Sequence, residues 1–478
     1  MDKINYLSQS TSLTIVVVIS LIFTLIGLTY SKKYQGINNY LTANRNIGFF
    51  SLSTSLVASA LGAWVLFGPA SAATWGGIGA VIGYALGTAF PMIFLIPLGK
   101  KIRNEFSKGS TLIEFLRKRF GKSLFKLILL MTIFYMFVFL CAEVTAVAIL
   151  INYISGTELW VTASIILIST LAYTLYGGLR ASIFTDMIQM IVILILFLIS
   201  VIYLTSFTGD QFSFSFINEK NPQLLSGNYI PNYTAGLTFF IAVAATNLFH
   251  QGNWQRVYAA KNNKILKKSL IFAFIVIIPI VLFMGFSGLV AVSVDSNVRP
   301  DLGFFSLLLR DQTEFLSMII VILGLSLTIS TVDTLINAIS SLIVVDGKAT
   351  FNVTNKINYL DFSKYFIVGL SIVTFIIASK GFSILYLFLL ADLFCCAFVL
   401  TVFYSFYNKK LDEKTAYISI IIGLIGGFLL FPAPDFSKSL LVGMMLPVDF
   451  FPLFVSQSLL FLSFLVATFI PVAIWKLR

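Results

Sequence analysis

Apolar runs as long as a membrane helix recur from one end of the chain to the other, and no other feature limits its fold as strongly. A helix needs about 20 apolar residues to cross the hydrocarbon core of a bilayer. Only 11% of the 478 residues are charged, whereas soluble domains carry about 25%. Transmembrane β-barrels have shorter segments in which polar and apolar residues alternate. The sequence therefore predicts an all-α, polytopic membrane protein.

Thirteen of these runs are predicted to be membrane spans. They lie near residues 12–30, 49–75, 77–98, 123–153, 158–176, 182–206, 235–252, 266–294, 313–346, 362–379, 382–406, 415–431 and 453–475. The segments between them are too short to hold a hydrophobic core of their own. We therefore expect a single transmembrane domain over residues 1–478.

The basic residues are distributed unevenly between the two sides that these spans define. With the N-terminus outside the cell, 26 of the 32 Lys and Arg residues fall on the cytoplasmic side, including the clusters at 100–126 and 256–268. This positive-inside pattern predicts a cytoplasmic C-terminus in a plasma or inner cell membrane. The same loops account for the formal charge of +12, so no nucleic-acid partner is expected.

The ninth span carries more polar side chains than a helix in hydrocarbon should. Five of them share one stripe of the helix: Ser326, Ser330, Asp333, Asn337 and Ser340. A carboxylate is costly in hydrocarbon, so Asp333 must face protein or water. Single hydroxyls in such helices often bond their own backbone or support helix packing. A whole stripe that includes an acid and an amide favours a site for a small cation, which hard oxygen ligands bind.

The second and seventh spans are interrupted. In the second, a run of small residues at 58–63 precedes Gly68 and Pro69, and the seventh ends in a polar stretch at 246–253. Broken helices at matching places in two halves are typical of a transporter binding site. Because these spans are five apart, we expect two inverted five-span repeats. These are spans 2–6, about 49–206, and spans 7–11, about 235–406, with spans 1, 12 and 13 peripheral.

Four acids fall inside predicted spans, away from the residues at the span ends: Glu143, Asp186, Asp333 and Asp392. Asp186 either caps the start of the sixth helix, where it complements the helix dipole, or serves a cation, and the sequence leaves both roles open. His250, the only histidine, is interpreted as a hydrogen-bonding group rather than a proton carrier. The sequence has no HExxH, GxSxG or phosphate-loop motif, so neither enzyme activity nor a cofactor is expected.

Two motifs resemble those of the sodium/solute symporters, a family that includes proline, pantothenate, urea and sodium/glucose cotransporters. Residues 176–190, YGGLRASIFTDMIQM, are similar to the family's signature at the start of its sixth span. Residues 330–346, STVDTLINAISSLIVVD, are similar to its ninth-span segment, and 254–269 to its basic loop. The resemblance covers about residues 12–410. It implies the five-plus-five inverted-repeat fold of the leucine transporter.

The resemblance also implies a sodium site between the break in the second span and the ninth span. Carried over by position, its ligands are the carbonyl oxygens of Ala58, Leu61 and Leu327 and the hydroxyls of Ser330 and Thr331. Asp186 is expected on the route by which sodium leaves to the cytoplasm. Free carbonyls at membrane depth need interrupted backbone, which agrees with the broken second span.

The expected solute site departs from that of the proline symporters. Ala60 stands where those proteins carry an Asp, and Gly62-Ala63 replaces a Ser-Gly pair, so proline is not expected. Seven residues are the candidate substrate contacts: Gly62, Trp64, Glu143, Asn247, His250, Gln251 and Asp392. Glu143 and Asp392 add acid near the cavity, which suits an amine or a solute with several hydrogen-bond donors. Urea, amino acids and amines remain open.

The predicted function is sodium-coupled symport of a small polar organic solute, with sodium, the solute and the bilayer as partners and no obligate protein partner. One alternative is a proton-coupled symporter of the same fold. Another is a solute sensor that no longer transports. Sensors usually append a signalling domain, whereas this sequence ends at Arg478 directly after the thirteenth span.

Overall fold

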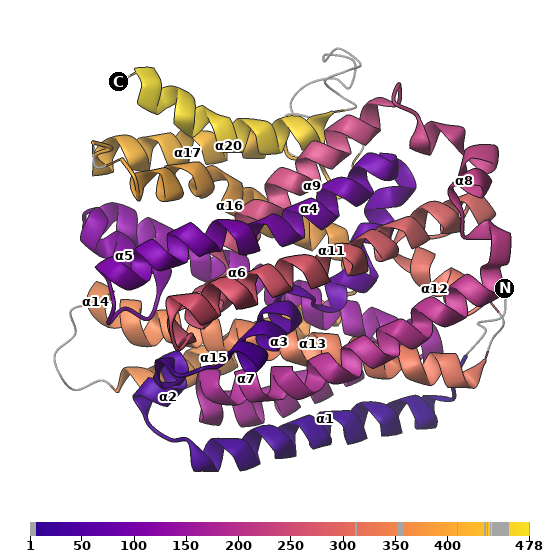
Figure 1. Ribbon diagram of the computed structural model, residues 1–478, viewed down its shortest axis with the longest axis horizontal. Coiled ribbons are helices and arrows are strands. Elements are labelled where there is room, and N and C mark those ends of the chain that lie inside the picture. Colours follow the sequence, from indigo (N-terminus) through magenta and orange to yellow (C-terminus); the bar gives the residue numbers. More distant parts are fainter. Residues whose placement is uncertain are drawn as a thin grey trace.

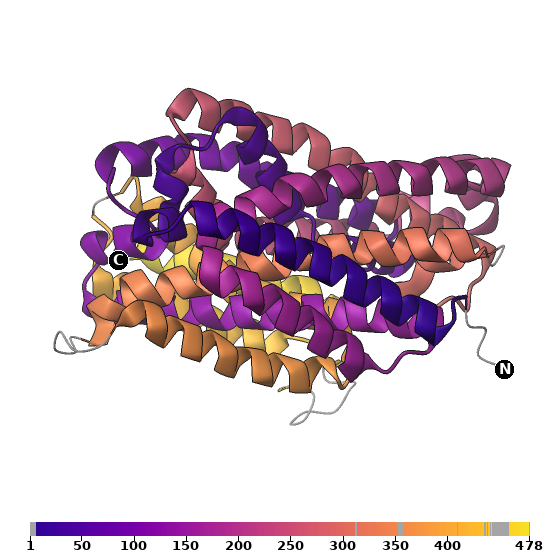
Figure 2. The ribbon, with the colours of Figure 1, turned by 90° about the horizontal axis from the view of Figure 1, so that it is seen from below.

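The computed structural model is a bundle of long, roughly parallel helices (Figures 1 and 2). It describes residues 6–310, 313–351, 358–408, 410–434, 436, 438–439, 441 and 458–477. Its long helices are α1 (Gln9–Lys33), α4 (Gly68–Glu105), α6 (Lys122–Ser155), α7 (Leu159–Thr208), α9 (Ile230–Phe249), α11 (Asn263–Val294), α13 (Glu314–Leu342), α15 (Tyr359–Ala378), α16 (Ile384–Ser405), α17 (Glu413–Leu430) and α20 (Leu459–Leu477). The shorter helices are α2 (Ile37–Thr42), α3 (Phe49–Ala60), α5 (Leu112–Arg119), α8 (Phe214–Lys220), α10 (Gln251–Ala259), α12 (Gly303–Leu308) and α14 (Lys348–Phe351).

The helices confirm an all-α, multi-pass membrane protein. In the described part of the chain, ten helices are long and apolar enough to cross a membrane. The 50 residues of α7 would extend about 75 Å as one straight helix, more than twice the hydrocarbon thickness of about 30 Å. Gly178 interrupts α7 with φ +59° and Gly77 interrupts α4 with φ +61°, a backbone region that glycine adopts without strain.

In the residues that the structure describes, counting these bends gives thirteen membrane crossings. Dividing α7 at Gly178 adds one span, α3 with the start of α4 forms another, and α9 with α10 forms a third. The start of α1 and the end of α20 lie at opposite ends of the bundle, as an odd number of crossings requires (Figure 1). Residues 453–457 of the predicted last span lie outside the described residues, and its helix begins at Leu459.

Two helix groups enclose the centre. On one side α4 packs against α9 and α11, and on the other α13 packs against α6 and α7. Small residues allow the closest approach, because a Cβ on Gly83 would lie 2.0 Å from the carbonyl oxygen of Gly236 in α9. α1 runs along one edge of the bundle, whereas α17 and α20 run along the opposite edge (Figure 1). We call the end that carries α5 and the end of α20 the basic end, since the nine Lys and Arg residues of 100–126 lie there.

Candidate functional site

The first break lies between α3 and the 3₁₀ turn Ala63–Leu66. Glu143 of α6 holds it open, because its carboxylate accepts hydrogen bonds from the backbone N–H groups of Ala63 at 2.8 Å and Trp64 at 3.5 Å. A carboxylate at this position satisfies donors that have no helical partner. Gly62 leaves room for it, since a Cβ there would lie 2.2 Å from a Glu143 oxygen. The last carbonyls of α3 are thereby left without intrahelical partners.

The second break lies at His250, between α9 and α10. Side chains of α10 pair with the last carbonyls of α9: the Asn253 amide donates to the oxygen of Asn247 at 2.9 Å, and the Trp254 indole donates to Leu248 at 2.7 Å. The chain therefore changes direction without leaving those carbonyls unpaired in the membrane. Both predicted interruptions are present as broken helices.

A small central cavity lies between the two breaks. Its lining residues are Ser59, Ala60, Trp64, Tyr84, Phe139, Val243, Thr246, Asn247, His250, Phe388 and Asp392. Its volume is about 20 Å³, which is enough for about one water molecule. The structure is therefore a closed form, in which the cavity must widen to admit an organic solute.

Aromatic rings and one carboxylate dominate this cavity. Trp64 stacks on Tyr84 with ring centres 5.5 Å apart, and Phe388 meets Trp64 edge-on at 6.5 Å. Asp392 is 4% exposed and accepts a hydrogen bond from the Thr246 hydroxyl at 2.5 Å. None of the ion pairs among the described residues includes Asp392. A buried carboxylate without a basic partner, beside aromatic faces, is suited to bind an organic cation.

The candidate sodium ligands lie on α3, at the break that follows it, and on α13. α13 packs against both α3 and the 3₁₀ turn after the break. The Ser330 hydroxyl donates to Asp186 at 2.6 Å, which leaves its oxygen lone pairs free to face a cation. The Thr331 hydroxyl is buried and has no hydrogen-bond partner among the described protein atoms. Leu327 is buried about one turn earlier on α13. Ala58 is buried in the last turn of α3, and Leu61 ends that helix.

Asp186 lies at the centre of a buried polar cluster that connects α3, α7, α10 and α13. The guanidinium of Arg256 donates to it at 2.7 Å, and neither side chain is exposed. The Ser55 hydroxyl donates to the same carboxylate at 2.6 Å and accepts from Arg256 at 2.7 Å. Arg256 also donates to Thr334 at 2.9 Å. These partners all come from other helices, so the position of Asp186 differs from that of a helix cap.

Comparison with known proteins identifies the architecture. The model of the sodium:solute symporter family matches residues 40–423. The chain belongs to this family. A spermidine transporter of Candida albicans is 26% identical over 408 residues, which are 83% of this chain and 76% of the relative. Sodium/glucose cotransporter 1 of Ovis aries is 29% identical over 196 residues, 39% of this chain and only 28% of the relative.

Solved structures agree with the fold. A sodium-coupled sialic acid symporter, solved in a substrate-bound outward-open state, superposes with a TM-score of 0.70 at 17% identity, covering 96% of this chain and 97% of the other. A nucleobase-cation-symport-1 family transporter has a TM-score of 0.55 at 13% identity, covering 93% and 95% of the two chains. By its family, the symporter is a sodium-coupled solute transporter and not an enzyme, in agreement with the sequence analysis.

A second acid of the symporter lies beside the cluster. Asp333 accepts hydrogen bonds from the hydroxyls of Tyr173 at 2.6 Å, Ser182 at 2.8 Å and Thr185 at 3.1 Å, all on α7. It faces protein, as the cost of an acid in hydrocarbon requires. Asp186, Asp333 and Arg256 together carry a formal charge of −1, which one monovalent cation would balance.

The predicted substrate contacts separate into two groups in the symporter. Trp64, Asn247, His250 and Asp392 line the central cavity, whereas Gly62, Glu143 and Gln251 lie outside its lining. Gln251 faces the segment before α5, where its side chain accepts from the N–H of Leu112 and donates to the carbonyl of Ser110. As solute contacts all seven residues stay predictions, and Glu143 supports the first break through the hydrogen bonds that it accepts there.

Two features of the site were missed from the sequence. Arg256 was counted with the basic loop at 256–268, but it is fully buried and paired with Asp186. The only sequence signal for this burial is its place at the end of an interrupted span. Tyr84, Phe139 and Phe388 line the cavity from three separate spans, and aromatic residues in spans usually contact lipid or other helices.

Proposed function

We propose that the symporter carries a small protonated amine together with sodium into the cell by alternating access. The observation that carries this proposal is the Asp392 carboxylate, buried in an aromatic-lined cavity without a basic partner among the described residues. An ammonium group would neutralise that charge and contact the ring faces of Trp64 and Tyr84. A neutral sugar or urea would leave the carboxylate buried and unbalanced, which is costly.

The likeness to a spermidine transporter supports the same class of solute. That relative aligns over 408 residues, which are 83% of this chain. His250 adds hydrogen-bonding capacity, because both of its ring nitrogens are buried without partners among the described atoms. The proposal therefore selects amines from the wider range of solutes that the sequence left open.

Sodium coupling rests on the chemistry of the oxygen set. The hydroxyls of Ser330 and Thr331 and free carbonyls at the end of α3 are hard neutral ligands, which suit a metal cation. Asp186 is not proposed as a direct sodium ligand. It contacts the site through Ser330, from whose hydroxyl it accepts a hydrogen bond. The alternative, proton coupling, needs a titrating ligand in direct contact with the ion site. The two inverted repeats, with α3/α4 and α9/α10 as their broken first spans, supply the alternating motion in this proposal.

The basic end is proposed to be cytoplasmic, with the N-terminus outside. Arg256 and its partners Asp186 and Ser55 close this end by tying α10 to α7 and α3. Backbone bonds reinforce the closure, since Ile47 exchanges N–H and carbonyl contacts with Ala259 and Lys261. Release of sodium and solute to the cytoplasm therefore requires this cluster to separate.

Uptake into proteoliposomes tests the function. We expect an inward sodium gradient to drive accumulation of labelled mono- or polyamines, and no comparable accumulation of glucose, urea or proline. A pH gradient in sodium-free buffer should not replace the sodium gradient. Equal uptake under a pH gradient alone would refute sodium coupling, and uptake confined to neutral solutes would refute the amine.

Asp186→Asn is expected to lower turnover by about tenfold or more, with little change in amine affinity at saturating sodium. The variant leaves the buried Arg256 charge without its partner next to the sodium route, and each 1.4 kcal/mol added to a barrier slows a step tenfold. Pre-steady-state uptake and equilibrium amine binding measure the two quantities.

The double variant Asp186→Asn/Arg256→Gln is the control for this reasoning. It removes both charges, so turnover should recover in part if the unpaired guanidinium is the cause. Parental turnover in Asp186→Asn alone would show that Asp186 has no role in release.

A further inference from the structure

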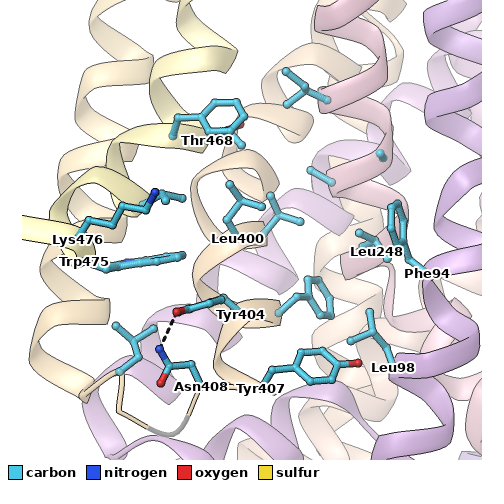
Figure 3. A pocket seen from close by; sticks show the side chains of 18 of the residues that line it. Phe94, Leu98, Leu248, Leu400, Tyr404, Tyr407, Asn408, Thr468, Trp475 and Lys476 are labelled. Carbon is cyan, nitrogen blue, oxygen red and sulfur yellow. Dashed lines mark hydrogen bonds between the residues drawn. The ribbon is translucent and has the colours of Figure 1, made fainter.

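A large groove on the membrane-facing side of the bundle is separate from the solute cavity. It has a volume of about 1010 Å³ and is formed by α4, α9, α16, α20 and the segment between α16 and α17 (Figure 3). It shares no lining residue with the central cavity. The proposed transport function leaves it unused.

The inner part of the groove is apolar and open to the bilayer. Ile241, Leu248 and Leu400 line it, together with two phenylalanines that remain nearly half exposed, Phe94 at 46% and Phe469 at 49%. All five residues belong to membrane spans. Lipid chains are therefore the natural contacts of this surface.

The other end of the groove is aromatic and polar. Trp475 stacks on Tyr404 with ring centres 5.0 Å apart, and the Asn408 amide donates to the Tyr404 hydroxyl at 2.7 Å (Figure 3). Tyr407 and Lys476 lie beside them (Figure 3). Trp and Tyr concentrate at the depth of lipid headgroups, where one end of the ring system is apolar and the other is wet.

The dimensions match one leaflet of a bilayer. Thr468, at the apolar end, and Lys476, at the polar end, are eight residues apart on α20. That separation corresponds to about 12 Å along the helix. One leaflet contributes about 15 Å of hydrocarbon. The groove therefore runs from headgroup depth most of the way to the middle of the membrane.

The charge at the polar end is positive. Lys410 and Lys476 line the groove, and no ion pair among the described residues involves either one. Asp412 is the acid of this lining, but its carboxylate accepts the N–H of Thr415 at 3.1 Å and caps α17. Hydrogen bonds from the Thr415 hydroxyl and N–H lower the pKa of Asp412, so it stays ionised at the helix start.

We propose that this groove binds one anionic phospholipid, with its phosphate at Lys410 and Lys476 and an acyl chain along Ile241, Leu248 and Leu400. Basic residues at the cytoplasmic ends of neighbouring spans form this kind of headgroup site. A protonated amine, the proposed solute, would be repelled by the two lysines. The bound lipid also lies next to the second break, because Phe403 of the groove stacks on Trp254 of α10 at 6.1 Å.

Native mass spectrometry of the purified full chain tests the site, with phosphatidylglycerol and phosphatidylcholine of identical acyl chains as probes. We expect one phosphatidylglycerol to be retained at least tenfold more than phosphatidylcholine. Lys410→Gln/Lys476→Gln should weaken its retention by about fivefold per lysine and so by roughly 25-fold in all. Asp412→Asn keeps a good helix cap and should strengthen retention.

Two further variants distinguish lipid binding in the groove from a general attraction of anionic lipids to basic residues. Lys267→Gln/Lys268→Gln removes the same charge from exposed positions at the start of α11 and should retain the lipid like the parent. Val472→Trp fills the groove from α20 and should release the lipid while the lysines remain. Equal retention of both probes by the parent, or equal loss in the two double-lysine variants, would overturn the proposal. Each variant is compared at equal monodispersity in size-exclusion chromatography, so that misfolding is not read as lost binding.

Discussion

Replacing Asp392 with Asn is expected to raise the amine concentration for half-maximal uptake by roughly 30-fold or more. Asn keeps the shape and the contact with Thr246 but removes the charge that would pair with the ammonium group. Removing one member of a buried, hydrogen-bonded charge pair costs about 2–5 kcal/mol, and 2 kcal/mol is about 30-fold in affinity. Initial rates of sodium-driven amine uptake measure the effect.

Asp361→Asn is the matched control for this variant. Asp361 is an exposed acid at the start of α15, so its removal should leave amine affinity unchanged. If Asp392→Asn transports the amine with the parental half-saturation, the ammonium group does not pair with Asp392 and the amine proposal fails.

Ser330→Ala and Thr331→Ala should each raise the sodium concentration for half-maximal transport by about 5- to 150-fold. Each variant removes one oxygen from a cation that has lost its water, and an unmet buried partner costs on the order of 1–3 kcal/mol. Because sodium and solute binding are linked, amine affinity should fall at fixed sodium and recover at high sodium. Sodium titrations of uptake at several amine concentrations measure both effects.

Ser317→Ala provides the control on the same helix. Its hydroxyl donates to the carbonyl of Thr313, within its own backbone, so its loss should leave sodium dependence unchanged. Parental sodium dependence in both alanine variants at 330 and 331, with normal folding, would place the cation elsewhere.

The number and type of the membrane spans could be predicted from the sequence because the membrane imposes a length on each helix. The breaks could be predicted as well, since small and polar residues at 58–63 and 246–253 are poor material for a helix in lipid. Asp333 likewise had to face protein. The spans, the breaks and the orientation of Asp333 depend on short stretches of sequence and on the lipid bilayer around them.

The partners of buried groups could not be predicted in this way. Arg256 follows an interrupted span and precedes a basic loop, so the sequence suggests an exposed side chain. Its burial depends on the ion pair with Asp186 of α7, which lies far away in the sequence. The hydrogen bonds that the Glu143 carboxylate accepts from N–H groups at the first break join two distant spans, and its contact with the solute stays a prediction. Tyr84, Phe139 and Phe388 meet only because three distant spans converge. Such pairings depend on tertiary geometry that no single span contains.

The absence of a basic partner for Asp392 among the described residues has an electrical consequence. Together with the formal charge of −1 on Asp186, Asp333 and Arg256, it gives the two proposed binding sites of the empty protein a formal charge of −2. One sodium and one ammonium group would neutralise these two sites. A negative potential inside the cell then acts mainly on the step in which the empty protein turns from inward-facing to outward-facing. The potential drives the negative charge of the empty sites outward, with up to about 2.3 kcal/mol per elementary charge per 100 mV. Each transport cycle would therefore move two positive charges inward, and a voltage clamp would record it as an inward current.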